Sequence, residues 1–280
     1  YDMSGSGGMA MMATHTNDVD FDAYLANDRT LDDPEVVQVE PGGKVRLRII
    51  NGGGATAFVI DLGDVEGRIV AVDGNPVVPL AGRRFPIAMG QRLDIRLVMP
   101  ADGRAVPILA LREEGTERTG IVLRPGDAPV ARMATTGETA PEVDIAAFEL
   151  GLRALQPLQP RVADRVVVVD LGGGMMDYRW HLVTTGADLA PHTGERVELV
   201  FRNSTMMPHP MHLHGHHMQV VAVGDRRFAG AMRDTVMVPA GQAMTVAFDA
   251  VNPGRWALHC NHIYHMAAGM MLDFTYQDLA

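Results

Sequence analysis

The chain has 280 residues, 47% of them hydrophobic and 21% charged, so it is long and apolar enough for two domains that each have a core. A formal net charge of -10 argues against nucleic acid as a partner, and no apolar run reaches the roughly 18 residues of a membrane-spanning helix. The 30 glycines and 17 prolines favour short strands joined by turns over a helical bundle, and the single cysteine, Cys260, excludes an internal disulfide.

Residues 1–20 open the chain and are rich in glycine, serine and methionine without any periodicity, which predicts a flexible lead-in. Thioethers are soft ligands that suit Cu(I), and this segment carries several, at Met3, Met9, Met11 and Met12. A disordered chain end is the simpler interpretation, and we adopt it here.

Three segments in the first half of the chain match three in the second half at a spacing of about 151 residues. The matched pairs are 43–51 with 194–203, 70–72 with 221–223, and 90–95 with 241–246. Each segment alternates apolar and polar residues between turn signals, which is typical of half-buried strands in an antiparallel sandwich. The sequence therefore predicts an all-β fold of two tandem Greek-key β-sandwich domains.

The two predicted domains cover residues 21–124 and 161–280. Residues 125–160 lie between them and are largely polar, rich in proline and glycine at their start and mostly without periodicity, so we expect a linker. Within this linker, residues 145–155 have a weak helical spacing that is compatible with either a short helix or an extended connection.

Histidine gathers in two clusters of the second half, because eight of the 11 histidines lie between His209 and His265. Residues two apart in a strand point to the same face, so His212 and His214 are expected side by side as a pair of metal ligands. The same alternation places His259 and Cys260 on opposite faces of their strand. Two metal centres could then lie on either side of one short segment.

Cys260, His265 and Met270 follow one another at Cys-x4-His-x4-Met spacing, on an expected strand that runs into a loop. With His209 they supply two imidazoles, a thiolate and a thioether, the ligand set of a blue-copper site with a long axial methionine. A lone cysteine or methionine usually fills a core, and zinc also accepts histidine and cysteine. One thiolate with a late methionine suits copper better than zinc. His216 and His217 are expected beside the ligands or at the surface and not as ligands, and His181 and His192 are expected in structural positions.

At these residues the sequence resembles the C-terminal cupredoxin domain of the multicopper oxidases, the family of laccases and bacterial copper-resistance oxidases. The family pattern His-Pro-x-His-Leu-His-Gly-His is met from His209 to His216, and the pattern His-Cys-His-x3-His-x4-Met is met by His259, Cys260, His265 and Met270. The strands from residue 36 to 100 resemble the family's middle cupredoxin domain, which carries no copper ligands. The resemblance implies two tandem cupredoxin-like domains, the second and third of the family.

The resemblance also implies the function of each ligand. His209, Cys260, His265 and Met270 would hold a type 1 copper that takes single electrons from a reducing substrate, a phenol, a related organic compound or Cu(I). His212 would bind a type 2 copper, His214 and His259 would bind a type 3 pair, and the His259-Cys260 peptide would carry electrons to this cluster, where O2 becomes water. The resemblance further implies a periplasmic or extracellular location.

Two departures from the family pattern concern the cluster. Asn261 stands where the family has a second histidine, with His262 one place later, and a shift by one residue moves a side chain to the opposite face of a strand. The two His-x-His pairs of the family's first domain are also missing before His209. We therefore expect that the chain belongs to a longer oxidase with a further N-terminal cupredoxin domain, takes ligands from a neighbouring subunit, or has lost oxygen reduction.

Two other functions stay open at this point. A copper-binding electron-transfer protein without oxidase activity would suit the missing pairs and Asn261. Copper nitrite reductase also combines two cupredoxin domains with a His-Cys step, but its ligand loop after the cysteine is longer than Cys-x4-His and its blue copper lies in the first domain. Metal content per chain separates an oxidase from an electron carrier.

Overall fold

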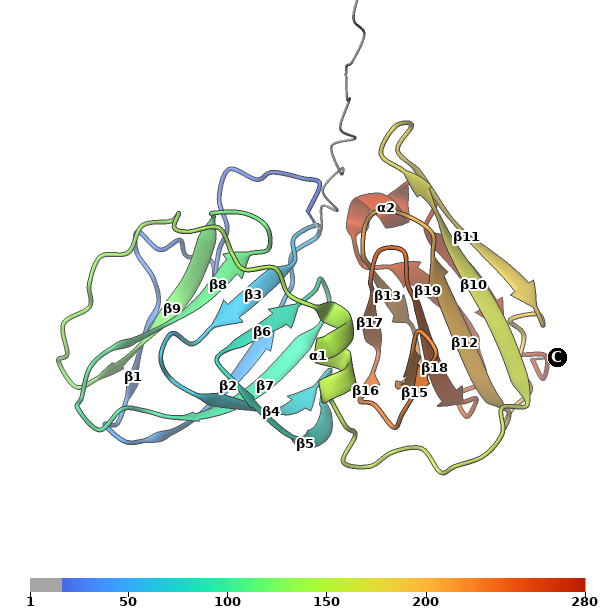
Figure 1. The fold of residues 1–280 in the computed structure, drawn as a ribbon, viewed down its shortest axis with the longest axis horizontal. Helices are drawn as coiled ribbons and strands as arrows, with labels where there is room; N and C mark the ends of the chain where they lie inside the picture. The colour runs from blue at the N-terminus through green and yellow to red at the C-terminus, as the bar shows by residue number, and fades with distance from the viewer. Residues whose placement is uncertain (1–16, 280) are drawn as a thin grey trace, which may run out of the picture.

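A computed structural model describes residues 17–279 of the chain. Residues 1–16 of the predicted lead-in, including its methionines, lie outside the described residues. Strands gather into two β-sandwiches that lie side by side, with one short helix between them (Figure 1). The prediction of an all-β fold is confirmed. Among residues 17–279, no helix combines the length and the apolar character that a membrane crossing needs.

The first sandwich packs a five-stranded sheet on a four-stranded one. The larger sheet has the order β1 (Val36–Val39), β9 (Arg118–Pro125), β8 (Val106–Arg112), β3 (Phe58–Asp61) and β6 (Arg84–Ile87). The smaller has the order β2 (Lys44–Ile50), β7 (Arg92–Val98), β4 (Gly67–Val72) and β5 (Asn75–Gly82). Aliphatic side chains such as Leu47, Ile69 and Ile95 fill the space between the sheets. A two-residue turn joins β4 to β5, and Asp73 and Gly74 both have positive φ there, as a type I′ hairpin requires.

The second sandwich is larger and holds both histidine clusters. One sheet has the order β11 (Arg179–Gly186), β10 (Arg165–Gly174), β12 (Arg196–Asn203), β18 (Ala243–Asp249), β14 (Met218–Val223) and β15 (Arg226–Arg227), with β16 (Met232–Arg233) paired to β14. The facing sheet has the order β17 (Thr235–Val238), β13 (His209–Leu213), β19 (Arg255–Cys260) and β20 (Met271–Thr275). A one-turn helix, α2 (Ile263–Ala267), follows β19.

The internal repeat of the sequence corresponds to equivalent strands. Its three matched pairs fall on β2 and β12, on β4 and β14, and on β7 and β18. These strands take the same places in their sheets, because the order β2-β7-β4-β5 recurs as β12-β18-β14-β15. The repeat is therefore a repeat of one sandwich design.

Helix α1 (Ile145–Gly151) lies between the sandwiches (Figure 1). Of the two structures compatible with the spacing of residues 145–155, a short helix is the one that forms. Its N-terminus is capped by Asp144, whose Oδ1 accepts the amide hydrogen of Ala147 at 2.8 Å. The chain then leaves the helix at Leu152, which is buried in the core of the first sandwich together with Ala231 from the second. The part of the linker around α1 is thus packed against both sandwiches.

Ion pairs join the two sandwiches. The fully buried guanidinium of Arg233 lies 3.3 Å from Asp73 of the first sandwich and 2.7 Å from Glu149 of α1. Beside it, Arg92 of the first sandwich donates through two nitrogens to the carboxylate of Asp234, at 2.6 Å each. These contacts fix the first sandwich against β16 and β17 of the second.

Candidate metal centres

The first group of donor atoms comprises His209, Cys260 and His265, all fully buried. Strands β13 and β19 are paired so that Met211 lies opposite Cys260, which brings the start of one strand beside the end of the other. Sγ of Cys260 lies 3.9 Å from Nδ1 of each imidazole, and the two Nδ1 atoms lie 3.2 Å apart. His265 reaches the group from helix α2, and the predicted strand running into a loop is wrong at this residue.

The outer nitrogen of each imidazole is hydrogen-bonded to an oxygen. Nε2 of His209 lies 2.8 Å from Oγ1 of Thr205, and that hydroxyl is within reach of acceptors on Asn203 and Met207. Nε2 of His265 lies 3.3 Å from Oδ2 of Asp18. Both bonds favour the tautomer with hydrogen on Nε2, which leaves the Nδ1 lone pairs directed at the cysteine.

Burial sets the protonation of this group. It lowers the pKa of His209 and of His265, and it raises the pKa of the Cys260 thiol. Both imidazoles are therefore neutral and able to act as ligands at neutral pH. The thiol loses its proton when a cation stabilises the thiolate, because metal ligation requires the deprotonated sulfur.

Met270 is joined to the same group through the backbone. Its amide donates to the carbonyl of His265 at 2.9 Å, and its carbonyl accepts the amide hydrogen of Cys260 at 3.0 Å. Met270 is fully buried in the core of the second sandwich. Backbone hydrogen bonds thus join the cysteine, the histidine and the methionine of the Cys-x4-His-x4-Met segment to one another.

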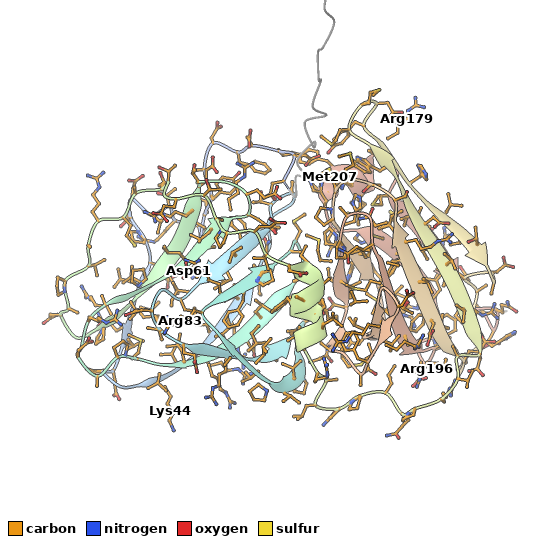
Figure 2. All side chains as sticks on the ribbon, in the orientation of Figure 1. Lys44, Asp61, Arg83, Arg179, Arg196 and Met207 are labelled. Carbon is orange, nitrogen blue, oxygen red and sulfur yellow. The ribbon has the colours of Figure 1, made fainter. Side chains whose placement is uncertain are left out.

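Aromatic rings cover the group on the side of β11. The ring of Trp180 lies 4.2 Å from that of His265 and 5.1 Å from that of His209, measured between centroids. Met207, which precedes His209 in the chain, is labelled in Figure 2 near the boundary between the sandwiches. Helix α2, which carries His265, also contacts the first sandwich, because the amide of Ile263 donates to the carbonyl of Gly54 at 2.8 Å. The first group therefore lies close to the boundary between the sandwiches.

The second group lies on the other face of β19. Nε2 of His214 and Nε2 of His259 are 2.8 Å apart, and the ring of His212 lies 4.8 Å from that of His214. Nδ1 of His259 donates to the carbonyl of Cys260 at 3.0 Å, so the lone pair of this imidazole lies on Nε2 of His259. The donor atoms of the first group all lie within 4.8 Å of one another. Within residues 17–279, those of these three histidines do not.

The orientation of His212 depends on the first sandwich. Its Nδ1 donates to the carbonyl of Asp234 at 2.8 Å, so its Nε2 carries the lone pair. Asp234 is held by Arg92, and Oγ1 of Thr235 lies 3.1 Å from the same Nδ1. Burial lowers the pKa of His212 and of His259, so both are neutral ligand candidates.

Asn261 and His262 turn to different surroundings. The amide of Asn261 donates to the carbonyl of Met89 and to Oγ1 of Thr235, both at 3.3 Å, so it packs at the boundary with the first sandwich. His262 turns the other way, stacks on His265 with ring centroids 3.7 Å apart, and bonds to Asp18. His262 therefore does not join His214 and His259 in this structure.

The other histidines are placed outside both groups. His216 is buried and its Nε2 lies 2.6 Å from the hydroxyl of Tyr276. His192 pairs with Asp278 at the surface, at 2.6 Å. His181 and His217 are exposed.

Asp18 is a further residue of the site that its sequence context did not indicate. Its side chain is buried, and its oxygens, with nitrogens of His262 and His265, form a second cluster of potential ligand atoms within 4.8 Å of one another. An isolated aspartate near the chain start carries no spacing or periodicity that would have revealed this contact. It is brought to the site only by tertiary folding.

The donor chemistry of the first group fits copper. Two lone pairs 3.2 Å apart repel each other unless a proton or a cation lies near them, and a thiol lies within 4 Å of both. Two imidazoles and one thiolate are the equatorial ligands of blue-copper sites, and hydrogen bonds already orient both imidazoles.

Two sequence models of the multicopper oxidase family match the chain, one over residues 2–118 and the other over residues 164–279. Multicopper oxidase MmcO of Mycobacterium tuberculosis is 32% identical over 269 residues, which cover 92% of this chain and 51% of that protein. A copper resistance protein A homolog of Pseudomonas syringae pv. tomato is 24% identical over 85% of this chain and 55% of its own length. The chain thus spans about half the length of these curated relatives.

Solved structures give the same picture of the fold. A laccase from Botrytis aclada superimposes with a TM-score of 0.73 at 21% identity, over 89% of this chain and 55% of the laccase. Fet3p, a multicopper oxidase that functions in iron import, superimposes with a TM-score of 0.72 at 19% identity, over 90% of this chain and 58% of Fet3p. At these identities the likeness establishes the cupredoxin fold of both sandwiches.

Proposed function

Because the chain belongs to the multicopper oxidase family, we propose that it is the copper-binding C-terminal part of an oxidase that uses O2 as electron acceptor. His209, Cys260, His265 and Met270 hold the type 1 copper. His212 is the ligand for the type 2 copper, and His214 and His259 are ligands for the type 3 pair. The boundaries 21–124, 125–160 and 161–280 for the two domains and their linker are part of this proposal.

One observation carries the proposal: a buried thiol lies 3.9 Å from the Nδ1 atoms of two imidazoles, each oriented by a hydrogen bond on its outer nitrogen. A core has no physical need for such a group, because each buried polar atom costs free energy unless it is paired. Copper ligation satisfies all three atoms together.

Bound copper supplies one-electron redox chemistry at the first group and, in a completed cluster at the second, the reduction of O2 to water. The protein contributes the connection between the groups. Cys260 and His259 are consecutive residues on opposite faces of β19, and Nδ1 of His259 donates to the carbonyl of Cys260 at 3.0 Å. A covalent path and a hydrogen-bonded path therefore join the two ligand groups.

The reducing substrate is a phenol, a related organic compound or Cu(I). The remaining ligands of the cluster come from an N-terminal cupredoxin domain or from a neighbouring subunit, and the protein works in the periplasm or outside the cell. The names of the relatives, which include laccases and copper resistance proteins, support this assignment.

A copper protein that transfers electrons without reducing O2 is the second candidate. Asn261 favours it, because this residue bonds to Met89 and Thr235 instead of offering an imidazole to the cluster. The two candidates differ in the number of coppers per chain.

The test is metal analysis of the copper-loaded chain together with electron paramagnetic resonance and the visible spectrum. We expect one type 1 copper per chain with an intense thiolate-to-copper band when the chain is alone, and three further coppers when the completing domain or subunit is present. Cys260→Ser should abolish the band and keep the circular dichroism of the fold. His212→Ala is the matched control and should keep the band; a blue Cys260→Ser protein would disprove the assignment.

A further inference from the structure

Residues 17–20 run across both sandwiches before the first strand begins. Asn17 binds the first sandwich, because its Nδ2 donates to the carbonyl of Glu113 and its Oδ1 accepts the amide hydrogen of Ala57, both at 2.8 Å. Asp20 pairs with Arg112 of the same sandwich. Between them, Asp18 reaches the second sandwich.

The carboxylate of Asp18 is enclosed, with 2% of its side chain exposed. Oδ1 lies 2.6 Å from Nε2 of His262, and Oδ2 lies 2.8 Å from the hydroxyl of Tyr178 and 3.3 Å from Nε2 of His265. Each oxygen of the carboxylate therefore has hydrogen-bond donors within reach, as a buried carboxylate needs.

His262 is arranged for this contact. Its ring stacks on that of His265, with an angle of 11° between the planes, and its side chain is 1% exposed. Its Nδ1 is buried without a hydrogen-bond partner within residues 17–279, which costs free energy. The only polar contact of the ring among these residues is the one that its Nε2 makes with Asp18.

We propose that Asp18 and His262 form a clasp that positions His265 for copper, and that residues 17–20 thereby make the type 1 site dependent on the segment before the first sandwich. Asp18 accepts the Nε2 hydrogen of His265, which keeps the Nδ1 lone pair towards Cys260. His262 holds the second oxygen of the carboxylate, so the carboxylate cannot rotate away. Asp18 and His262 are positioning residues and not ligands.

General chemistry gives the size of the effect. Removing the carboxylate or carbonyl that orients a metal-binding histidine typically lowers metal affinity by roughly 10- to 100-fold. The negative charge of Asp18 also stabilises the more positive oxidised copper, so its loss should raise the reduction potential of the site.

The experiment compares Asp18→Ala with Asp20→Asn in the chain as it stands. Asp20 lies in the same segment with its side chain 87% exposed, so its variant controls for disturbance of residues 17–20. We expect Asp18→Ala to bind copper roughly 10- to 100-fold more weakly, with a higher reduction potential and a shifted visible band. Asp20→Asn should match the wild type in all three. Affinity within twofold of wild type and an unmoved band in Asp18→Ala would overturn the proposal.

A second measurement works without copper. In the metal-free protein, nitrogen-15 NMR reports which nitrogen of His265 carries hydrogen, and Asp18→Ala should convert a single Nε2–H tautomer into a mixture. His262→Gln combined with Asp18→Ala should add little to Asp18→Ala alone, because both act through one contact. A second bound copper that disappears in Asp18→Ala would instead make Asp18 a ligand and overturn the clasp.

This inference rests on the proposed function, and the two fail differently. A wild-type chain without a type 1 signal refutes the copper site itself. A wild-type chain with that signal, combined with an unaffected Asp18→Ala, refutes only the clasp.

Discussion

The two sandwiches share one frame, and the clearest sign of it is a pair of equivalent asparagines. In the first sandwich, Nδ2 of Asn51 donates to the carbonyls of Thr56 and Ile87 at 2.8 and 3.1 Å. In the second, Nδ2 of Asn203 donates to those of Met207 and Val238 at 2.7 and 3.2 Å. Each asparagine thus joins the end of one strand to the loop that leads into the next.

The difference between the sandwiches lies on the strands that follow. Strand pairing places Phe58 of β3 where β13 has His209, and Asp61 where β13 has His212. Asp61, labelled in Figure 2, makes an ion pair with Arg84 at 2.9 Å. By the same register, Leu109 and Ala110 of β8 take the positions that His259 and Cys260 take on β19.

A few side chains on an unchanged frame thus separate the sandwich that carries the candidate ligands from the one that lacks them at the equivalent positions. The first sandwich still acts on the second, because Arg92 holds Asp234 and Gln91 donates to the carbonyl of Thr235 at 3.1 Å.

Arg233→Met should break the coupling between the sandwiches. It leaves Asp73 and Glu149 buried without their shared cation, and removing one partner of a buried ion pair costs about 3 to 5 kcal/mol. Urea unfolding of the metal-free chain measures the loss. Arg227→Met is the control, because this exposed pair with Glu198 is worth about 1 kcal/mol or less; equal losses would contradict the prediction.

Glu113, which directly follows β8, should make the stability of the chain depend on pH. Burial, assisted by Glu114 and Glu142, raises the pKa of Glu113 from 4.5 to about 7. The folded chain therefore holds this proton more tightly than the unfolded chain. Stability from this group is complete below about pH 4.5 and is lost as the pH rises through about 7, by roughly 3 kcal/mol in total.

Glu113→Gln tests this by urea unfolding of the metal-free chain at pH 5 and pH 8. The variant should lose most of the decrease that the wild type shows between these values. Glu66→Gln, at an exposed side chain, should keep the full decrease. An unchanged pH dependence in Glu113→Gln would exclude Glu113 as its source.

The equivalent asparagines separate stability from metal binding. Asn51→Ala and Asn203→Ala each leave buried carbonyls without a hydrogen-bond donor. The free energy of unfolding, measured in urea, should fall by about 1 to 3 kcal/mol in each variant. Only Asn203 also holds Thr205, whose Oγ1 donates to its Oδ1 at 2.7 Å and binds His209. Asn203→Ala should therefore shift the visible copper band as well, and Asn51→Ala should not; a shift in both would contradict the division.

The sequence predicted the fold well because strands have a short, regular period. Alternation in β2 and β12 and the recurrence of the pattern were visible along the chain. The seven residues of α1 were too few for the helical period to decide, and α2 was missed because its residues follow the ligand spacing of Cys260 and His265. Short helices at strand ends depend on packing more than on periodicity.

The candidate ligands were chosen by spacing, and the structure places His209, Cys260 and His265 together. The partners that orient them were not predictable, because Thr205 and Asp18 show no pattern of their own. Asp18 lies 247 residues before His265 in sequence. Contacts of that range follow from the docking of the two sandwiches, which no local pattern encodes.

Two equivalent glycines give the smallest and most local test. Gly90 and Gly241 both follow a strand of their repeat and both have positive φ, 79° and 66°. A Cβ at Gly241 would meet no atom within 4 Å, whereas one at Gly90 would lie 2.1 Å from Nδ2 of Asn261. Gly241→Ala should cost about 1 kcal/mol through the left-handed backbone alone.

Gly90→Ala should cost about 1 kcal/mol more than Gly241→Ala, because the amide of Asn261 must leave the carbonyl of Met89 and the hydroxyl of Thr235. Urea unfolding measures the difference. Since Thr235 also contacts Nδ1 of His212, the His212 ring resonances should move in Gly90→Ala and stay in place in Gly241→Ala. Equal costs with unmoved resonances would mean that Asn261 does not connect the first sandwich to the second ligand group.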